Sequence, residues 1–212
     1  MMDRRPMASR DERWGTALTQ SLAQRAFSPC QASLASVGFA ALAAVAFYFS
    51  VQDEGVARVI LLLSAAGFCQ LRLICNPVDG LVPVDAGKSA WDGPFWNEAP
   101  DRLSDTLILV GLGYGLGLPA LGWAAAAMAI GTAYVRELGR AATGDIDFSG
   151  PMAKPHRMAV ITIAALLACL TPLLDRPLGG NGVLIVALWM VAIGALITSL
   201  RRSAAMIARL RA

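Results

Sequence analysis

Long apolar runs alternate with short polar segments along most of the chain. A helix needs about 20 apolar residues to cross a hydrocarbon core of about 30 Å, and several runs reach that length. The run 103–134 is too long for one span, and Gly117 and Pro119 are expected to divide it into two helices. The pattern predicts an all-α integral membrane protein with six transmembrane helices. We expect the spans at about 31–51, 56–75, 103–134 (two helices), 158–174 and 183–200.

The beginning of the chain has a different pattern. Over residues 9–27, Trp14, Leu18 and Leu22 fall near one helical face, and Arg13 falls elsewhere. The segment is too polar, and too long before the first apolar run, for an ordinary cleaved signal peptide. We predict an N-terminal amphipathic interfacial helix that contacts membrane lipids. A solvated leader helix without lipid contact is the alternative.

Composition and charge placement define the class and its orientation. The chain has 212 residues, of which 56% are hydrophobic and 16% charged, and its formal net charge of +3 is too small to indicate nucleic acid as a partner. Most Lys and Arg residues fall on one side of the expected spans, whereas Arg58 and Arg176 fall on the other. The positive-inside tendency predicts a multi-pass protein of the inner (cytoplasmic) membrane with both termini in the cytoplasm. The expected parts are a cytoplasmic segment 1–30, a membrane domain 31–200 and a basic tail 201–212.

One polar segment, between the second and third spans, concentrates acidic and amide side chains. Its oxygen-bearing residues are Asn76, Asp79, Asn97, Asp101 and Asp105. If the flanking sequence is helical, their spacings of three and four residues place them on common faces. Carboxylate and amide oxygens suit a hard divalent cation, so the segment predicts a site for Mg²⁺ or Mn²⁺.

The order of these residues resembles the signature of the CDP-alcohol phosphatidyltransferases, D-x2-D-G-x2-A-R-x8-G-x3-D-x3-D. The spacing matches throughout, on Asn76, Asp79, Gly80, Pro83, Val84, Gly93, Asn97 and Asp101. The residue types are kept at Asp79, Gly80, Gly93 and Asp101. Asparagine replaces the first and third aspartates, and Pro-Val replaces Ala-Arg.

The resemblance implies an enzyme of phospholipid biosynthesis that transfers a phosphatidyl-type group. An alcohol acceptor attacks the phosphorus of a CDP-diacylglycerol-like lipid donor and CMP leaves, with two divalent cations neutralising the diphosphate. By the same resemblance, Asp79 ligates metal and holds the nucleotide, and Asp101 ligates metal and serves as general base. Gly80 and Gly93 permit close approach of the nucleotide to the backbone.

The two asparagines alter the expected metal site. An amide oxygen of Asn76 or Asn97 can ligate a cation but brings no negative charge. We therefore expect weaker binding of the second metal, use of a single metal, or loss of activity. Asp105 lies one turn beyond Asp101 and is a candidate to supplement the lost ligands or to accept hydrogen bonds from the asparagines.

Basic residues recur on the same side of the expected membrane. Arg136 and Arg140 end the fourth span, and Lys154 and Arg157 precede the fifth. We predict that these four side chains bind phosphate groups. Simple anchoring against anionic lipid headgroups is the alternative.

Glycines at positions 111, 113, 115 and 117 are spaced for close helix packing. They do not match a dinucleotide fingerprint, because the last glycine is misplaced and the context is a membrane helix. Close packing within the bundle or a homodimer seam explains them.

Three functions remain open from the sequence. The first is a phosphatidyltransferase, whose acceptor alcohol the sequence does not specify. The second is a catalytically altered family member that binds lipid or a partner membrane protein. The third is a transporter or other non-enzymatic bundle, for which the sequence shows neither repeated halves nor a polar path through the membrane.

Overall fold

A computed structural model describes residues 29–81, 93–170 and 179–211, and within these ranges the regular structure is all helical. The helices are α3 (Pro29–Gln52), α4 (Gly55–Leu81), α5 (Gly93–Gly115), α6 (Pro119–Thr143), α7 (Lys154–Leu170) and α8 (Gly179–Arg211). The predicted all-α class is confirmed. The predicted amphipathic helix, 9–27, lies outside the described residues.

Three of the described helices are long and apolar enough to cross a membrane. They include Gln31–Gln52, Gly55–Cys75 and Asn181–Arg211. The other three differ in composition or length. Helix α5 carries four charged residues between Glu98 and Asp105, α6 is rich in alanine and glycine, and α7 has 17 described residues. Six transmembrane helices therefore remain a prediction, of which three are supported by length and composition.

Helix boundaries follow the sequence pattern at some points and extend beyond it at others. The division of the third apolar run is confirmed, because α5 ends at Gly115, Gly117 adopts a φ of 70°, and Pro119 begins α6. In contrast, α4 continues past residue 75 and α5 begins well before residue 103. Likewise, α8 continues without interruption through the boundary expected at residue 200. Polar residues at these ends extend the helices instead of ending them.

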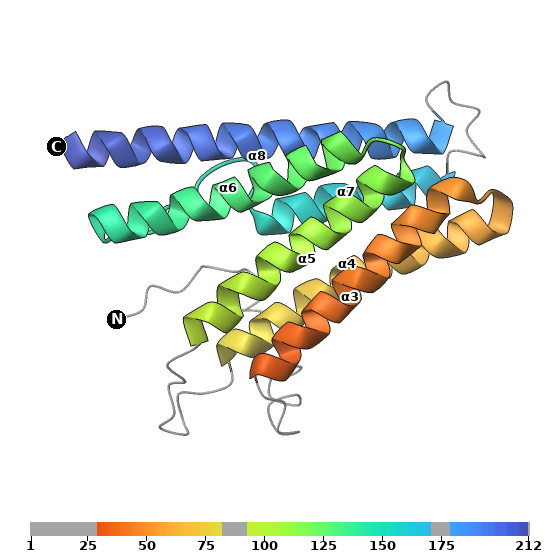
Figure 1. The fold of residues 1–212 in the computed structure, drawn as a ribbon, viewed down its shortest axis with the longest axis horizontal. Coiled ribbons are helices and arrows are strands. Elements are labelled where there is room, and N and C mark those ends of the chain that lie inside the picture. The colour runs from red at the N-terminus through yellow and green to blue at the C-terminus, as the bar shows by residue number, and fades with distance from the viewer. Residues whose placement is uncertain (1–28, 82–92, 171–178, 212) are drawn as a thin grey trace.

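Contacts between the helices close a ring. In order around it, α3 packs on α4, α4 on α7, α7 on α8, α8 on α6, α6 on α5, and α5 back on α3. Figure 1 shows α3, α4 and α5 as one tilted group and α6 to α8 as a second. Helices α4 and α5, which are consecutive in sequence, and α7, which is distant from both, thus surround one interior.

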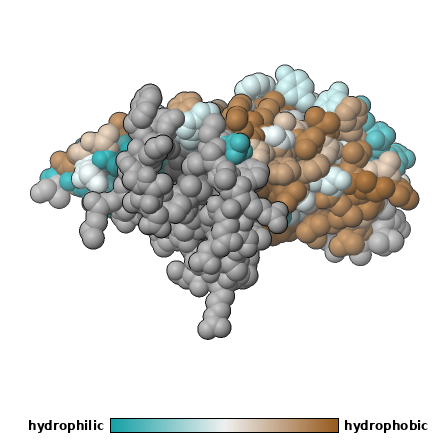
Figure 2. Space-filling view, turned by 90° about the horizontal axis from the view of Figure 1, so that it is seen from below, coloured by the Kyte–Doolittle hydropathy of each residue, from teal (hydrophilic) through white to brown (hydrophobic). Residues whose placement is uncertain are grey.

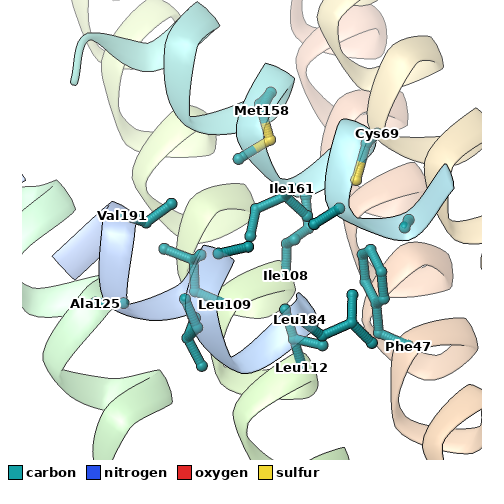
Figure 3. Close-up of a cluster of buried hydrophobic side chains, with 14 of the residues drawn as sticks. Phe47, Cys69, Ile108, Leu109, Leu112, Ala125, Met158, Ile161, Leu184 and Val191 are labelled. Atoms are coloured by element: carbon teal, nitrogen blue, oxygen red, sulfur yellow. The ribbon is translucent and has the colours of Figure 1, made fainter. Parts of the chain in front are cut away.

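Apolar side chains fill the middle of this ring. Phe47 of α3, Cys69 of α4 and Ile108 of α5 meet Ile161 of α7 and Leu184 of α8, and all five are fully buried (Figure 3). This burial of close-packed apolar side chains positions the six helices relative to one another. It also explains Cys69, which is a free, buried thiol that packs as a small hydrophobe.

The outer surface of the bundle is also apolar. Leu42 and Val45 of α3 and Ile193 and Leu196 of α8 are each about half exposed, as are many other large apolar side chains. Figure 2 shows a broad hydrophobic surface with hydrophilic residues toward its two ends. Large apolar side chains exposed in this way on several helices suit contact with lipid.

The glycines of α5 lie where neighbouring helices approach most closely. A Cβ on Gly111 would lie 2.8 Å from the Ala44 Cα, and one on Gly115 would lie 2.9 Å from the Tyr48 Cα. The interpretation as close helix packing is confirmed for Gly111, Gly113 and Gly115, because these contacts form within the chain, whereas a Cβ on Gly117 would meet nothing within 4 Å. A homodimer stays a prediction.

Helix α6 ends in a left-handed glycine. Gly144 has a φ of 76°, and its N–H donates to the Arg140 carbonyl at 3.0 Å. A side chain at this φ is strained, so Gly144→Ala is expected to lower the free energy of unfolding by about 1 kcal/mol. Gly139→Ala is the matched control, because its Cβ would meet nothing closer than 4.0 Å. Unfolding in mixed micelles with increasing dodecyl sulfate measures both variants, and equal stability of the two would contradict the argument.

Candidate functional site

The signature residues lie at the ends of two helices. Asn76, Asp79 and Gly80 belong to the last turns of α4, whereas Gly93 and Asn97 belong to the first turns of α5. Their side-chain placement lies outside the description, as do residues 82–92, which include Pro83 and Val84. Their predicted contacts with metal and nucleotide therefore stay predictions. The backbone alone brings the two halves of the signature to helix ends of the same bundle.

Asp105 joins three helices in the interior of the ring. Its Oδ1 accepts from Nη2 of Arg72 on α4 at 2.6 Å, and its Oδ2 accepts from Nη2 of Arg157 on α7 at 2.6 Å. All three side chains are at most 2% exposed. Since α5 and α7 are not neighbours in the ring, this bridge connects them across its interior. Both carboxylate oxygens are occupied, which favours a structural role for Asp105; its role as a metal ligand stays a prediction.

Asp101, one turn earlier on α5, is also paired with cations. Its Oδ1 forms a salt bridge with the Lys154 ammonium and lies 3.9 Å from Nη2 of Arg72. Arg72 Nη2 also donates to the Asp101 carbonyl at 3.1 Å. Burial is the main cause that lowers the pKa of Lys154, to about 8, and the Asp101 carboxylate opposes it. Asp101, the candidate base on α5, is thus held by Lys154, the first residue of α7.

The charged groups paired with Asp101 and Asp105 do not balance within the described residues. Arg72, Lys154 and Arg157 carry three positive charges against two on Asp101 and Asp105. Arg72 Nε and Nη1 and Arg157 Nε are buried and have no hydrogen-bond partner in the part of the chain that the structure describes. Buried donors without acceptors are costly. The cluster is therefore short of negative charge.

A second set of ion pairs lies at the surface side of this cluster. Glu98 of α5 forms salt bridges with Arg136, at 2.6 Å from its Nη2, and with Arg102. Burial raises the pKa of Glu98, but Arg136 and then Arg102 outweigh it and hold the pKa below its ordinary value. Glu137 also pairs with Arg136, at 2.8 Å, and with Arg140 Nε, at 3.1 Å. These carboxylates fix the arginine side chains in place.

Cationic side chains line a cavity of about 220 Å³, which we call the basic cavity. Its charged lining residues are Arg102, Arg136, Lys154, Arg157 and Arg202. Phe148 forms part of the wall, and its ring centre lies 5.9 Å from the Arg136 guanidinium carbon. Three of the four predicted phosphate-binding residues thus meet in one cavity. The fourth, Arg140, is about half exposed and pairs with Glu137.

Backbone carbonyls orient the arginines of the basic cavity. Arg202 Nε donates to the Ser149 carbonyl at 2.9 Å and its Nη1 donates to the Thr132 carbonyl at 2.8 Å. Arg157 Nη1 donates to the Met152 carbonyl at 3.0 Å and to Thr132 Oγ1 at 3.2 Å. The connection between α6 and α7 therefore fixes both guanidinium groups. A cavity lined this way suits an anion, because the positive charge is preorganised.

The described residues alone do not form a complete metal site. Within ranges 29–81, 93–170 and 179–211 there is no group of three or more His, Cys, Asp or Glu side chains placed to hold a metal ion. Asp101 is a described candidate ligand, and Asp79 is the other carboxylate of the signature. This donor set, with two amide oxygens, fits one hard divalent cation better than two, because Lys154 already occupies one oxygen of Asp101.

Three arginines of the site, Arg72, Arg102 and Arg202, were not predicted as functional residues. Arg72 stands four residues before Asn76 in an otherwise apolar run, and a charge in such a run is itself a signal. Arg202 was assigned to the basic tail, and no local pattern distinguishes it from its neighbours. Its position in the cavity depends on α6 packing against α8.

The fold resembles that of a known membrane enzyme. Phosphatidylinositol phosphate synthase PgsA1 of Mycobacterium tuberculosis, in complex with manganese and citrate, matches with a TM-score of 0.71 and 16% identity over 91% of this chain and 88% of that one. The same enzyme with CDP-DAG bound matches with a TM-score of 0.70 and 17% identity over 92% and 94%. No protein-family model matches the sequence, and no curated protein matches it. At this identity, the likeness shows a shared fold.

Proposed function

We propose that the protein is a CDP-alcohol phosphatidyltransferase of phospholipid biosynthesis. The main support is that a fold shared over 91% of the chain with a phosphatidylinositol phosphate synthase carries the spacing of the signature from the end of α4 to the first turns of α5. The shared fold and the divergent motif both support this proposal. The donor is a CDP-diacylglycerol-like lipid, in keeping with the CDP-DAG bound to the related fold.

The residues of this chain have distinct proposed tasks. The acceptor oxygen forms a bond to the lipid-linked phosphorus, the bond to CMP breaks, and the Asp101 carboxylate takes the hydroxyl proton. Asp79 and Asp101, with the amide oxygens of Asn76 and Asn97, would hold Mg²⁺ or Mn²⁺. When bound, the cation supplies positive charge to the diphosphate. Gly80 and Gly93 leave room for the nucleotide beside the backbone.

The basic cavity indicates the kind of acceptor. Arg136, Arg157 and Arg202 line it, and all three are buried and held by neighbouring groups. Preorganised guanidinium groups bind phosphate by charge and by paired hydrogen bonds. We therefore propose an alcohol acceptor that carries an anionic group. Lys154, which also lines the cavity, reaches from it to Asp101.

The membrane arrangement follows the same proposal. We place six helices across the inner membrane, with the basic cavity and both termini on the cytoplasmic side and the N-terminal helix in the interface. The cations of the site support this orientation, because they gather at one end of the bundle, whereas Arg58 lies at the other end beside Asn181. A homodimer is part of the proposal, but the glycines of α5 pack against α3 and α6 within the chain and do not support it.

One alternative has a specific observation in its favour. A family member that has lost catalysis and binds lipid or a partner would also keep this fold. The two asparagines and the pairing of Asp101 with Lys154 favour it, since both reduce the negative charge available to a metal. Turnover by the purified protein separates the two functions.

The test is release of CMP by the detergent-purified chain from CDP-diacylglycerol with Mn²⁺ or Mg²⁺, using phosphorylated and neutral alcohols as acceptors. We expect release with a phosphorylated acceptor and a loss of at least about 100-fold in Asp101→Asn, since a general base contributes that much. Asp53→Asn is the matched control, because Asp53 is exposed at the opposite end of the bundle. Binding of CDP-diacylglycerol without release for any acceptor would favour the non-catalytic alternative.

A further inference from the structure

The signature and this chain differ by a defined amount of charge. The signature has aspartates at four positions, and this chain has asparagine at two of them, Asn76 and Asn97. Two carboxylates carry as much charge as one divalent cation. A site without these two carboxylates is expected to neutralise one divalent cation fewer than the signature site does.

Two cationic side chains lie beside Asp101, the signature aspartate whose side chain the structure describes. The ammonium of Lys154 forms a salt bridge with Oδ1 of Asp101, and Lys154 is only 9% exposed. Arg72 Nη2 lies 3.9 Å from the same oxygen and is fully buried. The two cations come from α7 and α4, which pack on each other in the ring, so their positions are fixed by packing.

The cluster around Asp101 has no negative charge to spare. Its described members sum to one positive charge, and three guanidinium nitrogens lack acceptors within the described ranges. Adding the carboxylate of Asp79 brings the sum only to zero. The repulsion between two divalent cations would then not be offset by negative charge. In a buried site the energy of that repulsion is several-fold larger than in water.

We propose that the Lys154 ammonium takes the place of one of two divalent cations at Asp101, so that the chain binds a single divalent cation. The inference rests on the proposed function for the identity of the site. Lys154 then acts as a positioning residue and a fixed charge. A fixed ammonium at this place supplies one positive charge beside the two of the bound cation, and that charge does not depend on metal concentration.

The test counts bound Mn²⁺ on the full chain in detergent, from the electron paramagnetic resonance signal of free Mn²⁺. We expect one Mn²⁺ for each wild-type chain and one for Asn76→Asp/Asn97→Asp, which retains Lys154. Adding Lys154→Met to that pair should raise the count to two, whereas adding Lys154→Arg should leave it at one. In the otherwise wild-type chain, Lys154→Met should tighten Mn²⁺ binding by roughly tenfold or more, because one nearby positive charge is removed.

Two Mn²⁺ or none on the wild-type chain would overturn the inference, as would two on any variant that retains Lys154. A count of one after Lys154→Met in the aspartate pair would also overturn it. The wild-type count stands even if a variant fails to fold. Because Mn²⁺ is counted without turnover, one bound ion with no release of CMP would refute the proposed function alone, and two ions with release would refute this inference alone.

Discussion

Asp105→Asn is expected to destabilise the folded protein by about 3–5 kcal/mol, the cost of removing one partner from a buried ion pair. Asp105 is 1% exposed, and its two oxygens accept from Arg72 and Arg157 at 2.6 Å each. An amide at this position keeps one acceptor oxygen but loses the charge. Two buried guanidinium groups would then lack their shared counter-ion, and the link between α5 and α7 would be lost.

Dodecyl sulfate unfolding in mixed micelles measures this effect, and Ser104→Ala is its matched control. Ser104 is the preceding residue, is fully buried, and its hydroxyl has no hydrogen-bond partner among the described residues. Removing that hydroxyl is expected to leave stability unchanged or slightly raised. Similar losses in both variants would indicate general sensitivity of α5 and would contradict the importance of the bridge.

A second variant separates charge from packing. Asp105→Asn combined with Arg157→Gln restores the net charge of the cluster, since one carboxylate and one guanidinium are removed together. We expect the pair to be less destabilised than the sum of the two single variants, with a coupling of at least about 1 kcal/mol. Additive losses would mean that Arg157 and Asp105 do not stabilise the fold through each other.

The helices were largely predictable because their signal is local. A long apolar run interrupted by a Gly-x-Pro sequence predicts two helices. The structure confirms that division, because α5 ends at Gly115 and α6 begins at Pro119. The ends of α4 and α5 were predicted less well. Asn76 and Asp79 read as a helix end in sequence, yet polar residues at the end of a membrane helix can continue it into the interface.

Several residues of the candidate site could be predicted from the sequence, but the ion pairs that they form could not. The spacing singles out Asp101 and Asp105, and charge near membrane helices singles out Lys154 and Arg157. Which cation meets which carboxylate depends on α7 and α4 packing into one ring, and that information lies in contacts between residues 29 to 53 positions apart. Asp105 was therefore expected at the metal, whereas its oxygens are found on two arginines.

Gly113→Ala is expected to lower the free energy of unfolding by about 2–3 kcal/mol, the upper part of the range for overpacking a well-packed interior. A Cβ on Gly113 of α5 would lie 2.6 Å from the Gly122 Cα and 2.9 Å from the Gly122 nitrogen of α6. These are backbone atoms, which no rotamer change can move away. The two helices would have to separate at the hairpin that joins them.

Gly67→Ala is the matched control, because it lies within α4 and its Cβ would meet nothing within 4 Å. There the exchange should be neutral or stabilising by about 0.5–1 kcal/mol, the usual gain of alanine over glycine inside a helix. Opposite signs for the same chemical change would show that contact between α5 and α6 is the cause. If Gly113→Ala were as stable as Gly67→Ala, the two helices could not be packed as closely as described. The spacing of α5 would then favour the homodimer seam instead.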